Sequence, residues 1–243
     1  MTALNYIIQK DHVCIAIDTL SLESDDRKPY AYMTKFILLP HLHTIVTGTG
    51  LGLLVSEWMA QARSNILGTD IDDLNQYTPD CLHKISAHYP QMNGSSTTIY
   101  HFGYSQNRDI FVCYAYRSNN NWMPEEILNG VGIKPAIKFE FESNFKLPNS
   151  FIKLMEFQRE EDLKLPLPKR LGIGGDIHFI FMDRNGINVQ KCHRFDSYEE
   201  DFQIMHEKTL KQNYRATFKT FQFGQAQGGR KFQPQEYIEY FED

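Results

Sequence analysis

The residue with the clearest chemical potential stands second in the chain. Met1 is followed by Thr2, a small residue of the kind that generally permits methionine aminopeptidase to remove the first methionine. A threonine at the chain end carries a hydroxyl and an α-amino group together, and such an amine has a pKa of about 7.7 to 8.0. Near neutral pH it can take the hydroxyl proton, directly or through a water molecule. We therefore expect Thr2, once Met1 is lost, to be a nucleophile that carries its own base.

Two charged residues stand where the expected strands would bring them close to Thr2. Two apolar strands are expected in residues 6–18, and a tight turn at residues 10–12 joins them. Asp18 ends the second of these strands. In a hairpin the end of the second strand lies beside the start of the first, so Asp18 is expected beside Thr2. Lys35 starts the next strand. An ammonium between the two would favour the free amine and stabilise the alkoxide.

A backbone donor for the reaction is expected at Gly48. Thr47-Gly48 follows a buried strand and stands just before a helix, where backbone amides are unpaired and point outward. Attack by Thr2 creates an oxyanion that needs such a donor, and glycine lets a substrate approach the backbone closely. On this interpretation the amide of Gly48 forms the oxyanion hole.

The elements that must position these residues follow one another as strands, two helices, strands, a helix, strands and a last helix. Strands are predicted at residues 6–18, 34–47, 96–117, 132–141 and 177–195, helices at about 51–62, 70–88, 149–163 and 198–211, and a polar surface loop at 21–29. Pro79 is expected to start or kink the second helix. The strands are apolar on both faces, which is typical of sheets covered on both sides.

This order of elements favours an α+β fold of antiparallel sheets with helices outside them. We predict a four-layer αββα sandwich, in which two antiparallel sheets lie between helical layers. It is expected to form one domain over residues 1–243, with a weakly ordered tail from about residue 224.

Composition limits the function classes. The chain has 243 residues, of which 42% are apolar, and its 25 basic and 30 acidic residues give a formal charge of -5. That balance argues against nonspecific nucleic-acid binding, and no apolar run reaches the roughly 18 to 20 residues that cross a bilayer. The cysteines show no short metal or redox spacing: Cys14, Cys81, Cys113 and Cys192. We therefore expect a cytoplasmic protein with reduced thiols that binds neither nucleic acid nor membrane.

At these positions the chain resembles the proteasome β-subunit and HslV family of N-terminal threonine hydrolases, also called Ntn hydrolases. The matching residues are Thr2, Ala16-Ile17-Asp18-Thr19, Lys35-Phe36-Ile37 and Thr47-Gly48. The resemblance covers residues 1–65 well and continues loosely through the two following helices and the hairpin after Gly174-Gly175. Residues 170–173 carry neither the acid nor the hydroxyl that active members usually have near this glycine pair.

The resemblance implies a role for each of these residues. Thr2 would be the nucleophile, Asp18 and Lys35 its charge partners, and Gly48 the donor of the oxyanion hole. It implies cleavage of a peptide or other amide bond through an acyl-enzyme on Thr2. It further implies a homo-oligomeric ring with the sites facing an internal chamber, and a possible ATPase partner.

Two other interpretations of the sequence stay open. The same fold without catalysis would serve as an assembly or interaction subunit. Gly48-x-Gly50-x-Gly52 between a strand and a helix also suggests nucleotide or small-molecule binding, with Asp70 or Asp72 near the ribose, although the spacing differs from that of the dinucleotide fingerprint.

The remaining polar clusters are interpreted as structural. Among the histidines at positions 41, 43, 178 and 193, no pair has the i, i+4 spacing of helical zinc ligands. Residues 159–162 and 199–201 are interpreted as solvated helix faces. We therefore predict neither a metal nor a cofactor.

Overall fold

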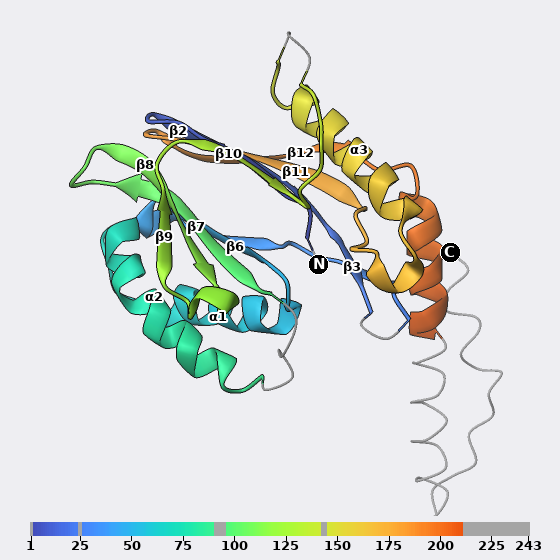
Figure 1. Ribbon diagram of the computed structural model, residues 1–243, viewed down its shortest axis with the longest axis horizontal. Helices are drawn as coiled ribbons and strands as arrows, with labels where there is room; N and C mark the ends of the chain where they lie inside the picture. Colours follow the sequence, from blue (N-terminus) through green and yellow to red (C-terminus); the bar gives the residue numbers. More distant parts are fainter. Residues whose placement is uncertain (1, 24–25, 90–95, 142–144, 211–243) are drawn as a thin grey trace, which may run out of the picture. The chain divides into compact units, whose positions relative to one another are not determined.

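The apolar residues near the start of the chain form the hairpin that their pattern predicts, and three further strands extend it into a sheet. This computed structural model describes residues 2–23, 26–89, 96–141 and 145–210 (Figure 1). The first sheet has the order β10-β1-β2-β11-β12, with every neighbouring pair antiparallel. Its strands are β1 (Leu4–Ile8), β2 (His12–Asp18), β10 (Gly130–Lys134), β11 (Asp176–Asp183) and β12 (Gly186–Arg194).

A second five-stranded sheet has the order β5-β6-β7-β8-β9, and it is antiparallel throughout. It consists of β5 (Phe36–Leu39), β6 (Thr44–Thr49), β7 (Thr98–Ser105), β8 (Ile110–Arg117) and β9 (Pro124–Ile127). A small third sheet pairs β3 (Leu20–Leu22) with β4 (Pro29–Tyr32). The helices are α1 (Gly52–Ser64), α2 (Ile71–Ser86) and α3 (Asn149–Lys164), with short 3-10 turns at Pro40–Leu42, Ser118–Asn120 and Leu167–Lys169. A last helix begins at residue 198 and continues to residue 210.

Alternating side chains of the two large sheets face each other and form one apolar cluster. Leu4 and Ile15 from the first sheet and Phe102 and Phe111 from the second belong to it, and all four are buried. In a strand, successive side chains point to opposite faces, so each sheet has a second apolar face to cover. The two sheets therefore pack on each other and need helices outside them.

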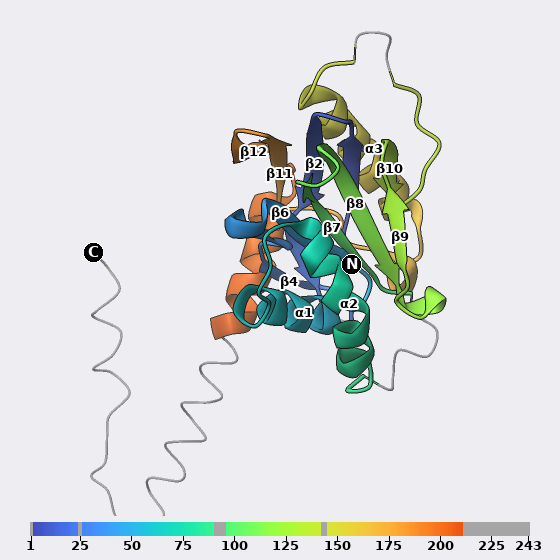
Figure 2. The ribbon, with the colours of Figure 1, turned by 90° about the vertical axis from the view of Figure 1, so that its left-hand side faces the viewer.

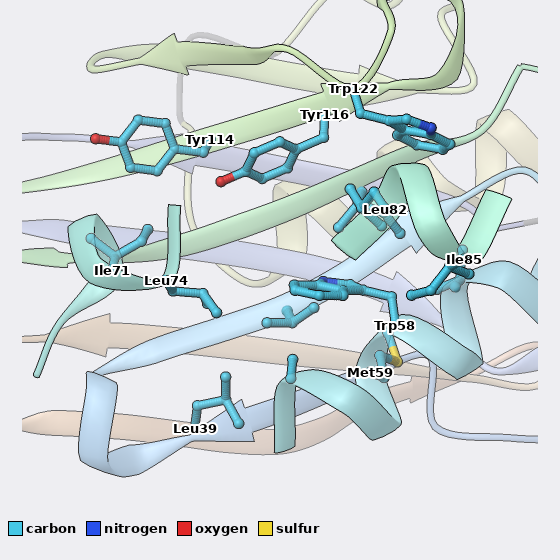
Figure 3. Packing of buried hydrophobic residues seen from close by; sticks show 14 of the residues in the cluster. Leu39, Trp58, Met59, Ile71, Leu74, Leu82, Ile85, Tyr114, Tyr116 and Trp122 are labelled. Carbon is cyan, nitrogen blue, oxygen red and sulfur yellow. The ribbon is translucent and has the colours of Figure 1, made fainter. Parts of the chain in front are cut away.

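Helices cover both outer faces. On the second sheet, Trp58 of α1 and Leu82 and Ile85 of α2 point into the same interior as Tyr116 of β8 (Figure 3). On the first sheet, α3 packs Phe151, Leu154 and Met155 against the other face of β2 and β11. Figure 1 shows α1 and α2 on one side of the sheets and α3 on the other, and Figure 2 shows α1 and α2 side by side. The described layers run helix, sheet, sheet, helix, and the predicted α+β class is confirmed.

By their internal contacts, the described residues up to Asp201 form one compact unit, and the described residues from Phe202 belong to a second. All residues discussed below belong to the first unit. A single domain over residues 1–243 stays a prediction, and the expected tail from residue 224 lies outside the described residues.

The structure corrects three local predictions in part. The loop predicted at residues 21–29 is shorter than expected, because Ser21 and Leu22 belong to β3 and Pro29 begins β4. Pro79 does not start α2, because the helix begins at Ile71 and continues past Pro79 to Ser86. The strand predicted at 132–141 is β10, which ends at residue 134 because Pro135 has no N–H for the sheet ladder.

Candidate functional site

Asp18 is the centre of a buried polar site at the end of β2. Its side chain is fully buried, and donors from three other parts of the chain reach its carboxylate. Oδ1 accepts hydrogen bonds from the amide of Ala3 and from Lys35 Nζ, each at 2.9 Å, and Oδ2 accepts one from the amide of Gly174 at 3.3 Å. The structure therefore brings Asp18 and Lys35 together beside the residue that follows Thr2.

The register of the first hairpin places the start of the chain at this carboxylate. Leu4 pairs with Ile17, which puts Ala3 opposite Asp18, and the amide of Asp18 donates to the carbonyl of Ala3 at 3.4 Å. Leu4, Tyr6 and Ile8 all face the cluster between the sheets. Thr2 lies two residues before β1 and directly precedes Ala3, whose amide binds Asp18. Thr2 is partly exposed.

Burial and charge act in opposite directions on the ion pair. Lys35 and Asp18 are joined at 2.9 Å, with side chains 8% and 0% exposed. Burial lowers the pKa of Lys35 and raises that of Asp18, because both groups lose water, and their mutual attraction opposes both shifts. The carbonyl of Lys35 also accepts a hydrogen bond from Thr47 Oγ1 at 2.7 Å. The position of Lys35 is therefore restrained, and Asp18 favours its charged form.

Gly48 does not stand immediately before a helix, as the sequence analysis expected. It lies within β6, opposite Ile99 of β7, and α1 begins four residues later at Gly52. A Cβ at this position would be 2.8 Å from Val55 Cγ2 and 3.1 Å from Ile99 Cδ1. Glycine is therefore required for packing α1 on β6. Thr47 is the last residue of β6 with a partner on β5, so Gly48 lies beside the segment that contains Lys35.

Two residues of α3 that the sequence analysis interpreted as solvated are parts of this region. Asp162 is 5% exposed and Arg159 is partly buried. Both bind the segment that precedes β11 and contains Gly174. The buried positions of α3 include 151, 155, 158 and 162. This spacing of four, three and four residues is the helical signal that would have identified Asp162 as an inward-facing residue.

The acids considered for nucleotide binding have structural partners. Asp70 caps α2 by accepting hydrogen bonds from the amides of Asp72 and Asp73, and it also accepts one from the amide of Gln106. Asp72 forms an ion pair with Arg108 at 2.9 Å. These contacts explain both acids without a ribose.

The histidines do not gather into a metal site. Among the residues that the structure describes, no three His, Cys, Asp or Glu side chains are placed to hold a metal ion. None of the helices in the described ranges combines the length and apolar character needed to cross a membrane.

No known protein family and no curated protein sequence matches this chain. The site must therefore be interpreted from its own geometry.

Proposed function

We propose that this chain is an N-terminal threonine hydrolase with the αββα fold of the Ntn hydrolases. It cleaves a peptide or other amide bond through an acyl-enzyme on Thr2 after Met1 is removed. One observation carries the proposal. The buried carboxylate of Asp18 binds both the ammonium of Lys35 and the amide of Ala3, so that a charge pair lies against the residue next to the nucleophile.

The chemistry follows from the groups at this end of the sheets. The α-amine of Thr2 takes the hydroxyl proton, and the alkoxide attacks the substrate carbonyl. The tetrahedral oxyanion collapses, the C–N bond breaks, and the α-ammonium gives its proton to the leaving amine. Water then attacks the ester with the α-amine as base, which releases the acid and restores Thr2.

Lys35 and Asp18 have separate roles in this scheme. The ammonium of Lys35 favours the unprotonated form of the neighbouring amine and stabilises the developing negative charge. Burial alone would lower the pKa of Lys35, and Asp18 opposes that loss of charge. In the proposed site Gly48 donates its amide to the oxyanion, and its place beside the segment of Lys35 supports this role.

The layered fold and the position of Thr2 also support the Ntn hydrolase class, whose members work as rings. The proposal therefore includes a cytoplasmic homo-oligomer with peptide substrates and an ATPase that delivers them. A second candidate is a non-catalytic subunit of the same fold that acts in assembly. Residues 170–173, which contain neither an acid nor a hydroxyl to organise the amine, favour that alternative.

Intact mass spectrometry and covalent labelling test the proposal. We expect the native protein to lack Met1 and to gain the mass of one peptide epoxyketone, a reagent that bonds to both the hydroxyl and the amine of a terminal threonine. Thr2→Ala should abolish the adduct, and Lys35→Ala should slow its formation severely. Lys28→Ala is the matched control, because Lys28 is an exposed lysine that pairs with Asp26.

The two candidates give different results. Complete retention of Met1 contradicts the hydrolase as stated. Loss of Met1 without any adduct favours the non-catalytic subunit. Equal labelling rates in the Lys35→Ala and Lys28→Ala variants would remove Lys35 from the mechanism.

A further inference from the structure

The segment between Leu167–Lys169 and β11 carries the third donor to Asp18. In this segment the amide of Gly174 donates to Asp18 Oδ2 at 3.3 Å, and its carbonyl accepts from the amides of Thr19 and Leu20 at 3.3 and 3.0 Å. Gly175 follows with φ of +78°, a left-handed conformation that glycine adopts without strain. These contacts fix one side of the segment against β2 and β3.

Asp162 of α3 holds the same segment from its other side. Its Oδ1 accepts from the amide of Leu171 at 2.7 Å and its Oδ2 from the amide of Gly172 at 2.9 Å. The carboxylate is buried, with the residue 5% exposed. A buried carboxylate with two backbone donors is a strong and directional contact, because charged hydrogen bonds are stronger than neutral ones. Asp162 therefore sets the path of the chain two residues before Gly174.

Arg159 holds the next residue of the segment. One guanidinium nitrogen donates to the carbonyl of Ile173, and the other donates to Ser197 Oγ at 2.6 Å. The guanidinium also lies over the ring of Phe195 at 5.3 Å. A Cβ at Gly174 would be 2.9 Å from Arg159 Nη1, so this side chain lies directly against the glycine. Arg159 and Asp162 are three residues apart and thus share one face of α3.

We propose that Asp162 and Arg159 are positioning residues of the threonine site, which act through the Gly174 amide on the carboxylate of Asp18. The inference rests on the proposed function. In this chain α3 thereby supplies the organisation of the segment before β11, where residues 170–173 contain neither an acid nor a hydroxyl.

The effect of the Gly174 contact on Asp18 can be measured as a change in the titration midpoint of this carboxyl group, which also depends on the charged groups around it. Lys35 is the charged group in contact with it. On the neighbouring strand β11, its register partner Ile177 is flanked by the titratable residues Asp176 and His178. A backbone donor favours the ionised carboxylate, so loss of the Gly174 contact moves the titration midpoint of Asp18 upward.

The test is a titration of the full chain by carbon-detected NMR of the aspartate carboxyl groups. Asp162→Asn places an amide NH2 where one of the two backbone N–H donors binds. Two or three hydrogen bonds from backbone amides together lower a carboxyl pKa by about 2 units. Loss of the Gly174 contact should therefore raise the titration midpoint of Asp18 by roughly half to one pH unit. Arg159→Lys, which can reach only one of its two acceptors, is the second variant and should give a smaller shift in the same direction. Glu161→Gln is the control: it makes the same charge change on α3 at an exposed pair with Lys164.

The second readout is epoxyketone labelling of Thr2 at pH 6 and at pH 8. The ratio of the rate at pH 6 to that at pH 8 should fall in both variants and stay unchanged in Glu161→Gln, because protonation of Asp18 increases first at the lower pH. A merely structural role changes both rates by one factor and leaves the ratio constant.

Each outcome decides the inference. If the Asp162→Asn chain does not fold, Arg159→Lys carries the test. An unchanged midpoint of Asp18 in the folded variants overturns the inference, and so does a shifted midpoint with a constant labelling ratio. Absence of an adduct in the native chain, before any variant is made, overturns the proposed function and the inference with it.

Discussion

Breaking the buried ion pair from either side should destabilise the protein strongly, with opposite dependence on pH. Lys35→Met leaves a fully buried carboxylate without its cation, and Asp18→Asn leaves a buried ammonium without its anion. Removing one partner of such a pair costs about 3 to 5 kcal/mol, because the remaining charge stays in a poorly solvated place. The double variant should lose less than the sum of the two single variants, because neither charge then remains.

The sign of each pH dependence follows from the charge that is left. In Lys35→Met, burial holds the pKa of Asp18 above its unfolded value of about 3.9, so the stability deficit is smallest below that pH and grows as the pH rises through the folded pKa. In Asp18→Asn, burial holds the pKa of Lys35 below its unfolded value of about 10.4. That deficit is smallest above pH 10.4 and grows as the pH falls through the folded pKa.

Urea unfolding at several pH values between 4 and 10 measures both deficits. The curves for the two single variants should cross, with Lys35→Met the more stable at the acidic end and Asp18→Asn at the alkaline end. Parallel curves, or a double variant whose loss equals the sum of the single losses, would refute this electrostatic reasoning.

Three further outcomes are expected. Gly48→Ala should destabilise the fold by about 1 to 3 kcal/mol in urea unfolding, because its Cβ would lie 2.8 Å from Val55 Cγ2; adding Val55→Ala should recover much of the loss, and no recovery would contradict the steric cause. Gln158→Leu leaves the buried amide of Asn5 unpaired and should lower the free energy of unfolding by about 1 to 3 kcal/mol. Adding Asn5→Leu should reduce that loss, and a double variant whose loss equals the sum of the two single losses would contradict the pairing. Burial lowers the pKa of His101 to about 3, so the histidine stabilises the fold above its unfolded pKa of about 6.5, and that contribution is lost as the pH falls toward 3. Unfolding free energies measured from pH 7 to 4 should fall less steeply in His101→Gln, and equal slopes would argue against this assignment.

The first hairpin and its charged residues follow from local sequence patterns. An apolar run, a polar turn and a second apolar run determine both strands and their antiparallel register. The pattern in residues 6–18 predicted that the end of the second strand lies beside the start of the first, and the observed register puts Ala3 opposite Asp18. The approach of Lys35 was also predicted, although Lys35 directly precedes β5, and β3 and β4 come between it and β2.

Contacts between distant segments were not predictable in the same way. The amide of Gly174 reaches Asp18 across 156 residues of sequence, and nothing near Gly174 marks it as a partner. Asp162 was interpreted as part of a solvated run because its neighbours Glu160 and Glu161 are charged, whereas its helical spacing from Gln158 places it inside.

Long-range packing also overrides the local signals at Pro79. A proline inside a helix removes one hydrogen bond and usually bends or ends the helix. In α2 the buried residues Leu74 and Leu82 lie on either side of Pro79 and pack into the same cluster as Trp58. Burial of this face stabilises the continuous helix, and that contribution cannot be read from residues 71–86 alone.

The four segments that meet at Asp18 give the site a dependence on the order of folding. Residues 3, 18 and 35 come from the first part of the chain, whereas residue 174 comes from the segment just before β11. A chain that ends before Gly174 lacks both that donor and β11, which is one of the two strands that pair with β2. During synthesis, the carboxylate therefore obtains its full set of donors only after most of the first unit has been translated, and a nascent fragment cannot complete the site early.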